Sequence, residues 1–202
     1  MVMTASTMME LGTTAPDFTL PSTEGTPVSL SDFSEAKAVV VMFICNHCPY
    51  VIHIAPVLAQ LAKSYAAKGV QFIAINSNDI AAYPADSMEN MVQEKAKQGY
   101  EFPYLLDESQ QVAKQYDAAC TPDIYLFDSA SKLAYRGQFD DSRPFRISSG
   151  NYDSERNPST GADLSAAIDT VLAGDAIEGT QYPSLGCNIK WIPGNEPAYF
   201  AG

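Results

Sequence analysis

Two cysteines and a histidine stand close together in the segment 44-ICNHCPYVIHIAP-56. Cys45 and Cys48 have the C-x-x-C spacing of a redox pair, and His47 directly precedes Cys48. A thiolate is the nucleophile in disulfide exchange, and a nearby positive charge lowers the pKa of a thiol. The segment therefore predicts thiol chemistry, in which Cys45 and Cys48 react as a pair or Cys48 reacts with Cys45 as a bystander.

The proline after the second cysteine indicates which thiol attacks. Proline suits the first position of a helix but costs about 3 kcal/mol in a helix interior. Pro49 therefore predicts a helix start that leaves Cys48 at the N-cap. Unpaired backbone N–H groups and the positive end of the helix dipole favour a thiolate there. We predict Cys48 as the nucleophile, with His47 stabilising its charge unless that histidine is simply exposed in the loop.

A second thiol is needed for turnover, supplied by this chain or by a partner. Cys45 is a candidate, because a turn at Asn46-His47 could bring the two Cα atoms within the roughly 7 Å that a disulfide needs. Its alternative is a cysteine packed beneath the loop. Cys187 lies in the C-terminal tail and is expected to be a packed, inert thiol.

A zinc site from these residues is disfavoured. Cys45, His47, Cys48 and His53 offer suitable ligand types, but no second C-x-x-C exists. The expected helix also directs His53 away from the loop, where it would be a half-buried surface group. We therefore predict no metal and no cofactor.

The composition excludes several classes of function. The 202 residues include 24 acidic and 12 basic ones, for a net charge of −12, so nucleic acids and anionic membrane surfaces are poor partners. No run approaches the roughly 18 apolar residues of a membrane span, and the first ten residues lack the features of a signal peptide. Four cysteines are too few for a disulfide scaffold. A cytoplasmic location is expected.

Strands and helices alternate along the chain, which predicts an α/β layer sandwich with an antiparallel edge. One domain is expected over residues 12–178, after an N-terminal extension at 1–11 and before a C-terminal tail at 179–202. Residues 140–161 are polar and predict a long surface loop. The expected elements are a hairpin at 15–30, strands at 38–44, 70–76, 103–107, 121–128 and 133–139, and helices at 49–68, 84–98, 109–118 and 163–174.

The element order, with a cysteine between the first core strand and its helix, resembles the thioredoxin fold. The opening APDFTLPSTEGTPVSLSDF is similar to the start of the alkyl hydroperoxide reductase/thiol-specific antioxidant family. The segments FICNHCPYV, YRGQFDD and GCNIKW resemble its peroxiredoxin-like branch. The resemblance covers roughly residues 12–192 and implies a three-layer sandwich around a central mixed sheet.

The resemblance also implies a register for the site. Thioredoxins have an Ala-Pro whose proline lies eight positions after the first cysteine, and Ala55-Pro56 stands so relative to Cys48. Phe43 lies five residues before Cys48, as the corresponding strand phenylalanine does. The usual second cysteine then falls on Val51, and the peroxiredoxin pattern P-x-x-x-T-x-x-C fits neither cysteine of the segment.

Thr121-Pro122 matches the cis-proline of thioredoxins, which lies against the nucleophile and pairs its backbone with substrate. This implies a substrate-binding role for Thr121 and Pro122 and makes Cys120 the second candidate resolving thiol. The alternative for Cys120 is a small core residue. The motif YRG-x-x-DD also occurs in the resembling branch. Asp140, Asp141 and Arg143 are expected to form a solvated turn or an ion pair that pins the loop, or else to face the substrate.

We therefore predict a thiol-disulfide oxidoreductase. Cys48 attacks a protein or small-molecule disulfide, Cys45 or Cys120 resolves the intermediate, and an external thiol reductant restores the enzyme. One alternative is a divergent peroxidase, in which a hydroperoxide oxidises Cys48 to a sulfenic acid. The other is a redox sensor or binding module without turnover. We also expect an exposed sheet edge through which two copies of this domain could form a homodimer.

Overall fold

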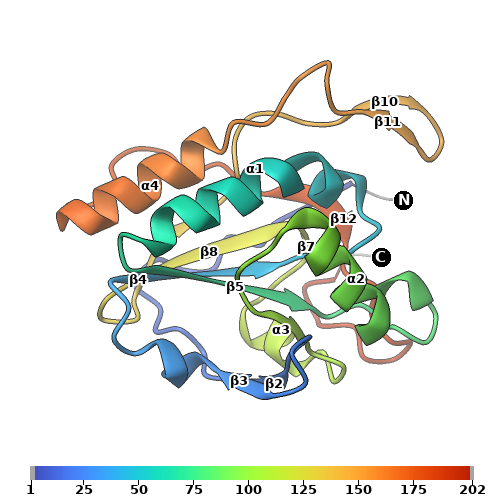
Figure 1. The fold of residues 1–202 in the computed structure, drawn as a ribbon, viewed down its shortest axis with the longest axis horizontal. Helices are drawn as coiled ribbons and strands as arrows, with labels where there is room; N and C mark the ends of the chain where they lie inside the picture. Colours follow the sequence, from blue (N-terminus) through green and yellow to red (C-terminus); the bar gives the residue numbers. More distant parts are fainter. Residues whose placement is uncertain (1–2, 201–202) are drawn as a thin grey trace.

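The computed structural model describes residues 3–200, built around a five-stranded sheet in the order β6-β5-β4-β8-β9 (Figure 1). The first three strands, β4 (Ala38–Phe43), β5 (Val70–Asn76) and β6 (Tyr104–Leu106), run parallel. The other two, β8 (Asp123–Asp128) and β9 (Leu133–Arg136), add an antiparallel edge. The predicted central mixed sheet is confirmed.

Strand β4 is buried along its whole length because the sheet is covered on both faces. Val40 and Met42 pack on one side, while Val39, Val41 and Phe43 pack on the other, as the two-residue period of a strand requires. Helices α1 (Pro49–Ala66), α2 (Met88–Gln98) and α4 (Ala162–Ala173) cover the first face. Helix α3 (Gln111–Gln115) and the hairpin of β2 (Thr19–Pro21) and β3 (Pro27–Ser29) cover the second. The predicted three layers are therefore present.

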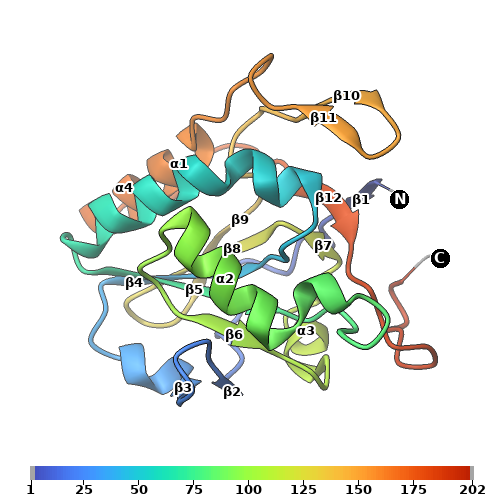
Figure 2. The ribbon, with the colours of Figure 1, turned by 45° about the vertical axis from the view of Figure 1, so that its right-hand side comes forward.

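A second, three-stranded sheet joins both ends of the chain to the middle. It has the order β1-β12-β7, where β1 is Met3–Ala5, β12 is Leu185–Asn188 and β7 is Cys120–Thr121 (Figure 2). No pattern in the tail of the sequence predicts a strand. Four residues, one of them glycine, are too few to show a periodicity, and their pairing partners are distant in the sequence.

The segment 140–161 contains more structure than the expected surface loop. Strands β10 (Phe145–Ser148) and β11 (Asn151–Asp153) form an exposed hairpin that projects from the body of the molecule (Figure 1). The start of the segment is instead buried at Asp140 and Ser142. The expected helix at 84–98 is divided into a 3-10 turn η2 (Pro84–Asp86) and α2, because the Ser87 side chain caps α2. A further turn, η1 (Leu30–Phe33), follows β3.

Candidate active site

The site lies where β4 leads into α1. Helix α1 begins at Pro49 with Cys48 as its N-cap residue, so the predicted helix start is confirmed. Cys48 is fully buried, with 0% of its surface exposed. The loop before it is held on the sheet by the Ile44 N–H, which donates to the Ile75 carbonyl at 3.0 Å. The nucleophile predicted from the sequence is therefore placed by the end of the central strand and the first turn of a helix.

Thr121-Pro122 has a cis peptide bond, as the resemblance implied, and Thr121 lies directly against the cysteines. In its thiol form, Cys48 donates to the Thr121 carbonyl at 3.1 Å. The Thr121 hydroxyl lies 3.5 Å from the Cys45 sulfur. The structure thus brings together Cys45, Cys48 and Thr121, which come from two distant parts of the chain.

Cys187 also reaches the nucleophile. Its sulfur lies 3.0 Å from the Cys48 sulfur. Strand β12 pairs antiparallel with β7, so that Cys187 stands opposite Thr121 and Asn188 stands opposite Cys120. The expectation of an inert thiol in the tail did not anticipate this position, and the only signal for it was the GCNIKW segment that carries the family resemblance.

The neighbours of Cys48 favour its thiolate. Burial by itself raises the pKa of this thiol, but hydrogen bonds from Cys187, Cys45 and the Thr121 side chain hold it well below its ordinary value. The same contacts, with burial, raise the pKa of Cys45 and Cys187 far above that of a free thiol. Of these three thiols, Cys48 is therefore the one that carries the negative charge, while Cys45 and Cys187 stay protonated.

Cys120 does not point at the nucleophile. Successive side chains of a strand face opposite sides, so Cys120 and Thr121 diverge. The Cys120 thiol donates to the Pro122 carbonyl at 3.4 Å, and burial raises its pKa well above the ordinary value. Its surroundings are those of the packed core cysteine that was its alternative role.

His47 is held by a carboxylate that the sequence did not reveal. Its Nδ1 lies 2.8 Å from Oδ2 of Asp86, and its ring stacks on Tyr83 with the centroids 5.8 Å apart. Asp86 is fully buried and accepts further hydrogen bonds from the Asn46 N–H and the Asn78 side chain. The hydrogen bond to Asp86 raises the pKa of His47, which favours a positive charge beside Cys48.

A metal could be held by Cys45, His47 and Asp86, whose ligand atoms all lie within 4.8 Å of one another. His53, which the sequence offered as a zinc ligand, lies outside this group. The hydrogen bond between His47 and Asp86 already accounts for their approach without a metal.

His53 is buried, with 5% of its surface exposed, which corrects its expected half-buried place. The start of the 140–161 segment folds over this face of α1, and His53 Nε2 lies 2.8 Å from the Ser142 hydroxyl. That hydroxyl in turn donates to Asp140. Asp140 also accepts hydrogen bonds from Ser159, Thr160 and Gly161, so it joins the two ends of the segment.

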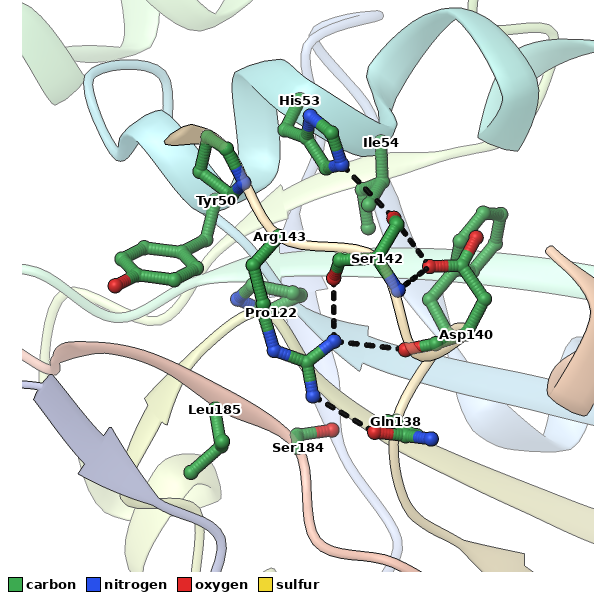
Figure 3. A pocket seen from close by; sticks show the side chains of 12 residues that line it. Tyr50, His53, Ile54, Pro122, Gln138, Asp140, Ser142, Arg143, Ser184 and Leu185 are labelled. Atoms are coloured by element: carbon green, nitrogen blue, oxygen red, sulfur yellow. Dashed lines mark hydrogen bonds between the residues drawn. The ribbon is translucent and has the colours of Figure 1, made fainter. Parts of the chain in front are cut away.

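Arg143 does not pair with Asp140 as an ion pair. It donates to the backbone carbonyls of Asp140 and Ser142 and to Gln138 (Figure 3). Arg143 and Pro122 line the same cavity. The cavity at this point measures about 20 Å³, which is room for about one water molecule. The hydrogen bonds of Asp140 and Arg143 therefore pin the segment beside the site.

Comparison with known proteins agrees with this geometry. The sequence profile of the AhpC/TSA family matches residues 11–136. A thiol-disulfide oxidoreductase ResA from Geobacillus kaustophilus is 30% identical over 130 residues, which are 64% of this chain and 70% of that protein. The ResA of Bacillus subtilis is 28% identical over 122 residues, 60% of this chain and 64% of that protein.

Solved structures match more of the chain. An uncharacterized conserved protein from Geobacillus kaustophilus is 49% identical with a TM-score of 0.88, covering 96% of this chain and 98% of the other. A hypothetical protein from Sinorhizobium meliloti 1021 is 47% identical with a TM-score of 0.87, covering 95% and 100%. The peroxidoxin BcpB of Mycobacterium tuberculosis shares the fold, at 22% identity and a TM-score of 0.59 over 82% and 97%. Within residues 3–200, no helix is long and apolar enough to cross a membrane.

Proposed function

Because the chain belongs to the AhpC/TSA family, we propose that it is a thiol-disulfide oxidoreductase with Cys48 as its nucleophile. One observation carries this proposal: a thiol at the N-cap of α1 whose pKa is held low by its neighbours and whose sulfur lies against Thr121. The relatives named thiol-disulfide oxidoreductase support the same chemistry.

The first step is an exchange between the Cys48 thiolate and a substrate disulfide. The Cys48 sulfur forms a bond to one substrate sulfur, and the substrate S–S bond breaks. The second substrate sulfur leaves as a thiolate and takes up a proton. A second thiol then attacks the mixed disulfide, so that the protein gains a disulfide and the substrate is reduced by two electrons in total.

The surroundings of Cys48 prepare it for this step. His47, whose positive form is favoured by Asp86, lowers the energy of the nearby thiolate by charge. The Thr121 side chain contributes a hydrogen bond to the thiolate. Low pKa also makes Cys48 a good leaving group when a reductant later opens the protein disulfide.

We propose a protein or small-molecule disulfide as the substrate and an external thiol as the reductant. As part of the same proposal, the protein acts in the cytoplasm, where thiol reductants are available; the sparse cysteine content supports this. Self-association through a sheet edge stays a prediction.

The proposal is tested by reduction of insulin with dithiothreitol as the electron source. The parent protein should accelerate insulin reduction, and Cys48→Ser should abolish the acceleration. Cys120→Ser is the matched control, because it changes a buried cysteine of the same region that faces away from Cys48. Consumption of a hydroperoxide by a protein that leaves insulin untouched would contradict the proposal and indicate the peroxidase. Activity retained by Cys48→Ser would contradict the assignment of the nucleophile.

A further inference from the structure

We propose that Cys187 is the resolving thiol of Cys48, and that strand β12 delivers it by occupying the β7 edge beside Thr121-Pro122. The inference rests on the proposed function and assigns its second step. It gives a role to the C-terminal segment, which lies outside residues 11–136 matched by the family profile.

The distance between the two sulfurs is the first support. They lie 3.0 Å apart, while a disulfide bond is about 2.05 Å long. An approach of about 1 Å would therefore form the bond, a movement within reach of side-chain rotation. Reacting atoms about 3–3.5 Å apart are also at the separation expected for a near-attack geometry.

The strand register is the second support. Cys187 stands directly opposite Thr121 in the β7–β12 ladder, and side chains of directly opposite residues project to the same side of a sheet. Thr121 is the residue whose carbonyl and hydroxyl contact Cys48 and Cys45. The pairing of the strands therefore aims Cys187 at the nucleophile. Cys120 belongs to the other side, together with Asn188.

Gly186 permits the close approach of the two strands. A Cβ atom at this position would lie 2.0 Å from the Thr121 carbonyl oxygen and 2.6 Å from its carbon, and backbone atoms of this kind cannot move aside easily. Only glycine lets β12 lie flat against the Thr121-Pro122 bond. The absence of a side chain at Gly186 therefore lets β12 hold Cys187 beside Cys48.

Hydrogen bonds fix both ends of β12. Before the strand, the Ser184 hydroxyl donates to the Gly137 carbonyl at 2.6 Å, and the Ser184 carbonyl accepts from the Ser6 N–H at 2.9 Å. After it, the Lys190 N–H donates to the Asn78 side chain at 2.8 Å. The tail is anchored to the domain on both sides of Cys187, so its sulfur has a defined position.

Cys45 is the competing thiol, because it also lowers the pKa of Cys48. It lies shortly after the end of β4 at Phe43, and its neighbour Asn46 is held by Asp86, Ala85 and Tyr104. This loop cannot withdraw without breaking those contacts. Strand β12 is four residues long, and within residues 3–200 it pairs with β1 over three residues and with β7 over two.

This difference matters because Cys48 is fully buried and some covering group has to move before a substrate sulfur can reach it. We take β12 as the group that moves, because its pairing with β7 spans two residues and the anchors at Ser184 and Lys190 return it to the same place. When β12 returns, it brings Cys187 back to Cys48. Closure of the strand and release of the substrate are then one event.

The charges of the site determine when Cys187 loses its proton and attacks Cys48. While Cys48 is a thiolate, its hydrogen bond and charge raise the pKa of Cys187, which stays protonated. Once Cys48 is in a mixed disulfide, that charge is gone, and Lys190 still favours the Cys187 thiolate. Cys187 then loses its proton and attacks the Cys48 sulfur. The bond from Cys48 to the substrate breaks, and the substrate leaves as a thiolate that takes up a proton.

Mapping of the oxidised parent protein tests the bond directly and needs no variant. The reduced full chain is oxidised with oxidised glutathione, blocked by alkylation and digested with trypsin. No lysine or arginine lies between Cys45 and Cys48, so both fall in peptide 38–63, while Cys120 falls in 115–132 and Cys187 in 157–190. We expect a disulfide between peptides 38–63 and 157–190. It should persist in Cys45→Ser and be lost in Cys48→Ser.

Turnover provides the second measurement. When Cys187→Ser is treated with oxidised glutathione, we expect the Cys48–glutathione mixed disulfide to accumulate. In the insulin assay with dithiothreitol, we expect its steady-state rate to fall at least tenfold. Cys120→Ser is the matched control in both measurements. A disulfide within peptide 38–63, or one to peptide 115–132, would overturn the inference. So would parent-like turnover of Cys187→Ser. In those cases a Cys48-dependent activity would still stand, whereas activity independent of Cys48 would remove the proposed function itself.

Discussion

Substitution of Gly186 by alanine should uncouple Cys187 from Cys48 without changing either thiol. The new Cβ would lie 2.0 Å from the Thr121 carbonyl oxygen, and real contacts under 3.0 Å are essentially never seen. Strand β12 must therefore withdraw from β7 by at least about 1 Å, the difference between these two distances. Carried to Cys187, the same shift takes the sulfur separation from 3.0 Å to about 4 Å.

The expected effect is large for the reaction and moderate for stability. A misplacement of about 1 Å can slow a positioned reaction by roughly 100-fold. We therefore expect the intramolecular disulfide to form about 100-fold more slowly in Gly186→Ala. Overpacking of this kind lowers the free energy of unfolding by about 1–3 kcal/mol. The pKa of Cys48 should rise, because the hydrogen bond from Cys187 that lowers it is lost.

The assay follows the reduced protein after addition of oxidised glutathione. Samples are quenched with acid at intervals and alkylated, and mass spectrometry then separates dithiol, mixed disulfide and intramolecular disulfide. Gly186→Ala should accumulate the mixed disulfide that the parent passes through quickly. Ile168→Val is a suitable control, since it alters a fully buried residue of α4, outside the β7–β12 pairing, and costs about 0.5–1.5 kcal/mol.

A parent-like rate of intramolecular closure in Gly186→Ala would refute the reasoning. It would mean that the flat packing of β12 on Thr121 is not what brings the two sulfurs together. A slowing that the Ile168→Val control reproduces would refute it equally, because the cause would then be general destabilisation.

Three further predictions concern the charged groups around the site. Asp86→Asn should lower the pKa of His47 towards its ordinary value, measured by NMR titration of the ring, and an unchanged pKa would show that Asp86 does not set it. His47→Gln should raise the pKa of Cys48, followed by the ultraviolet absorbance of the thiolate against pH; a parent-like curve would exclude a charge effect of His47. Asp140→Asn should lower the free energy of unfolding near neutral pH by about 2 kcal/mol, because burial of Asp140 is outweighed by hydrogen bonds that depress its pKa from 3.8 to about 2. Since a depressed carboxyl pKa stabilises the fold above 3.8 and this contribution is lost as the pH falls towards 2, the difference between parent and Asp140→Asn in urea unfolding should shrink over that range; a constant difference would contradict the assignment.

Local patterns carried much of the fold. The apolar, β-branched run of β4 predicts a strand buried on both faces, and its alternate residues do pack on opposite sides. Pro49 marked the start of α1 because proline lacks the N–H group that a helix interior needs. These features depend on neighbours in the sequence, so they can be read from it.

Other residues of the site have no such local signal. Asp86 lies in a polar stretch before α2, and only the packing of that stretch against the loop of His47 gives it a partner. His53 is buried by a segment that begins near residue 140, far along the chain. Their environments depend on contacts between distant segments, which composition and spacing do not specify.

The cysteine at the helix start and the histidine beside it were determined by the sequence alone, because proline geometry and thiol chemistry act over a few residues. The thiol that faces Cys48 was decided by the tertiary structure. Cys187 lies 139 residues away along the chain, in a strand too short to show a pattern, and it meets Cys48 at 3.0 Å only because β12 pairs with β7. Strand pairing between distant segments is a property of the folded chain, and it is what places the fourth cysteine in the site.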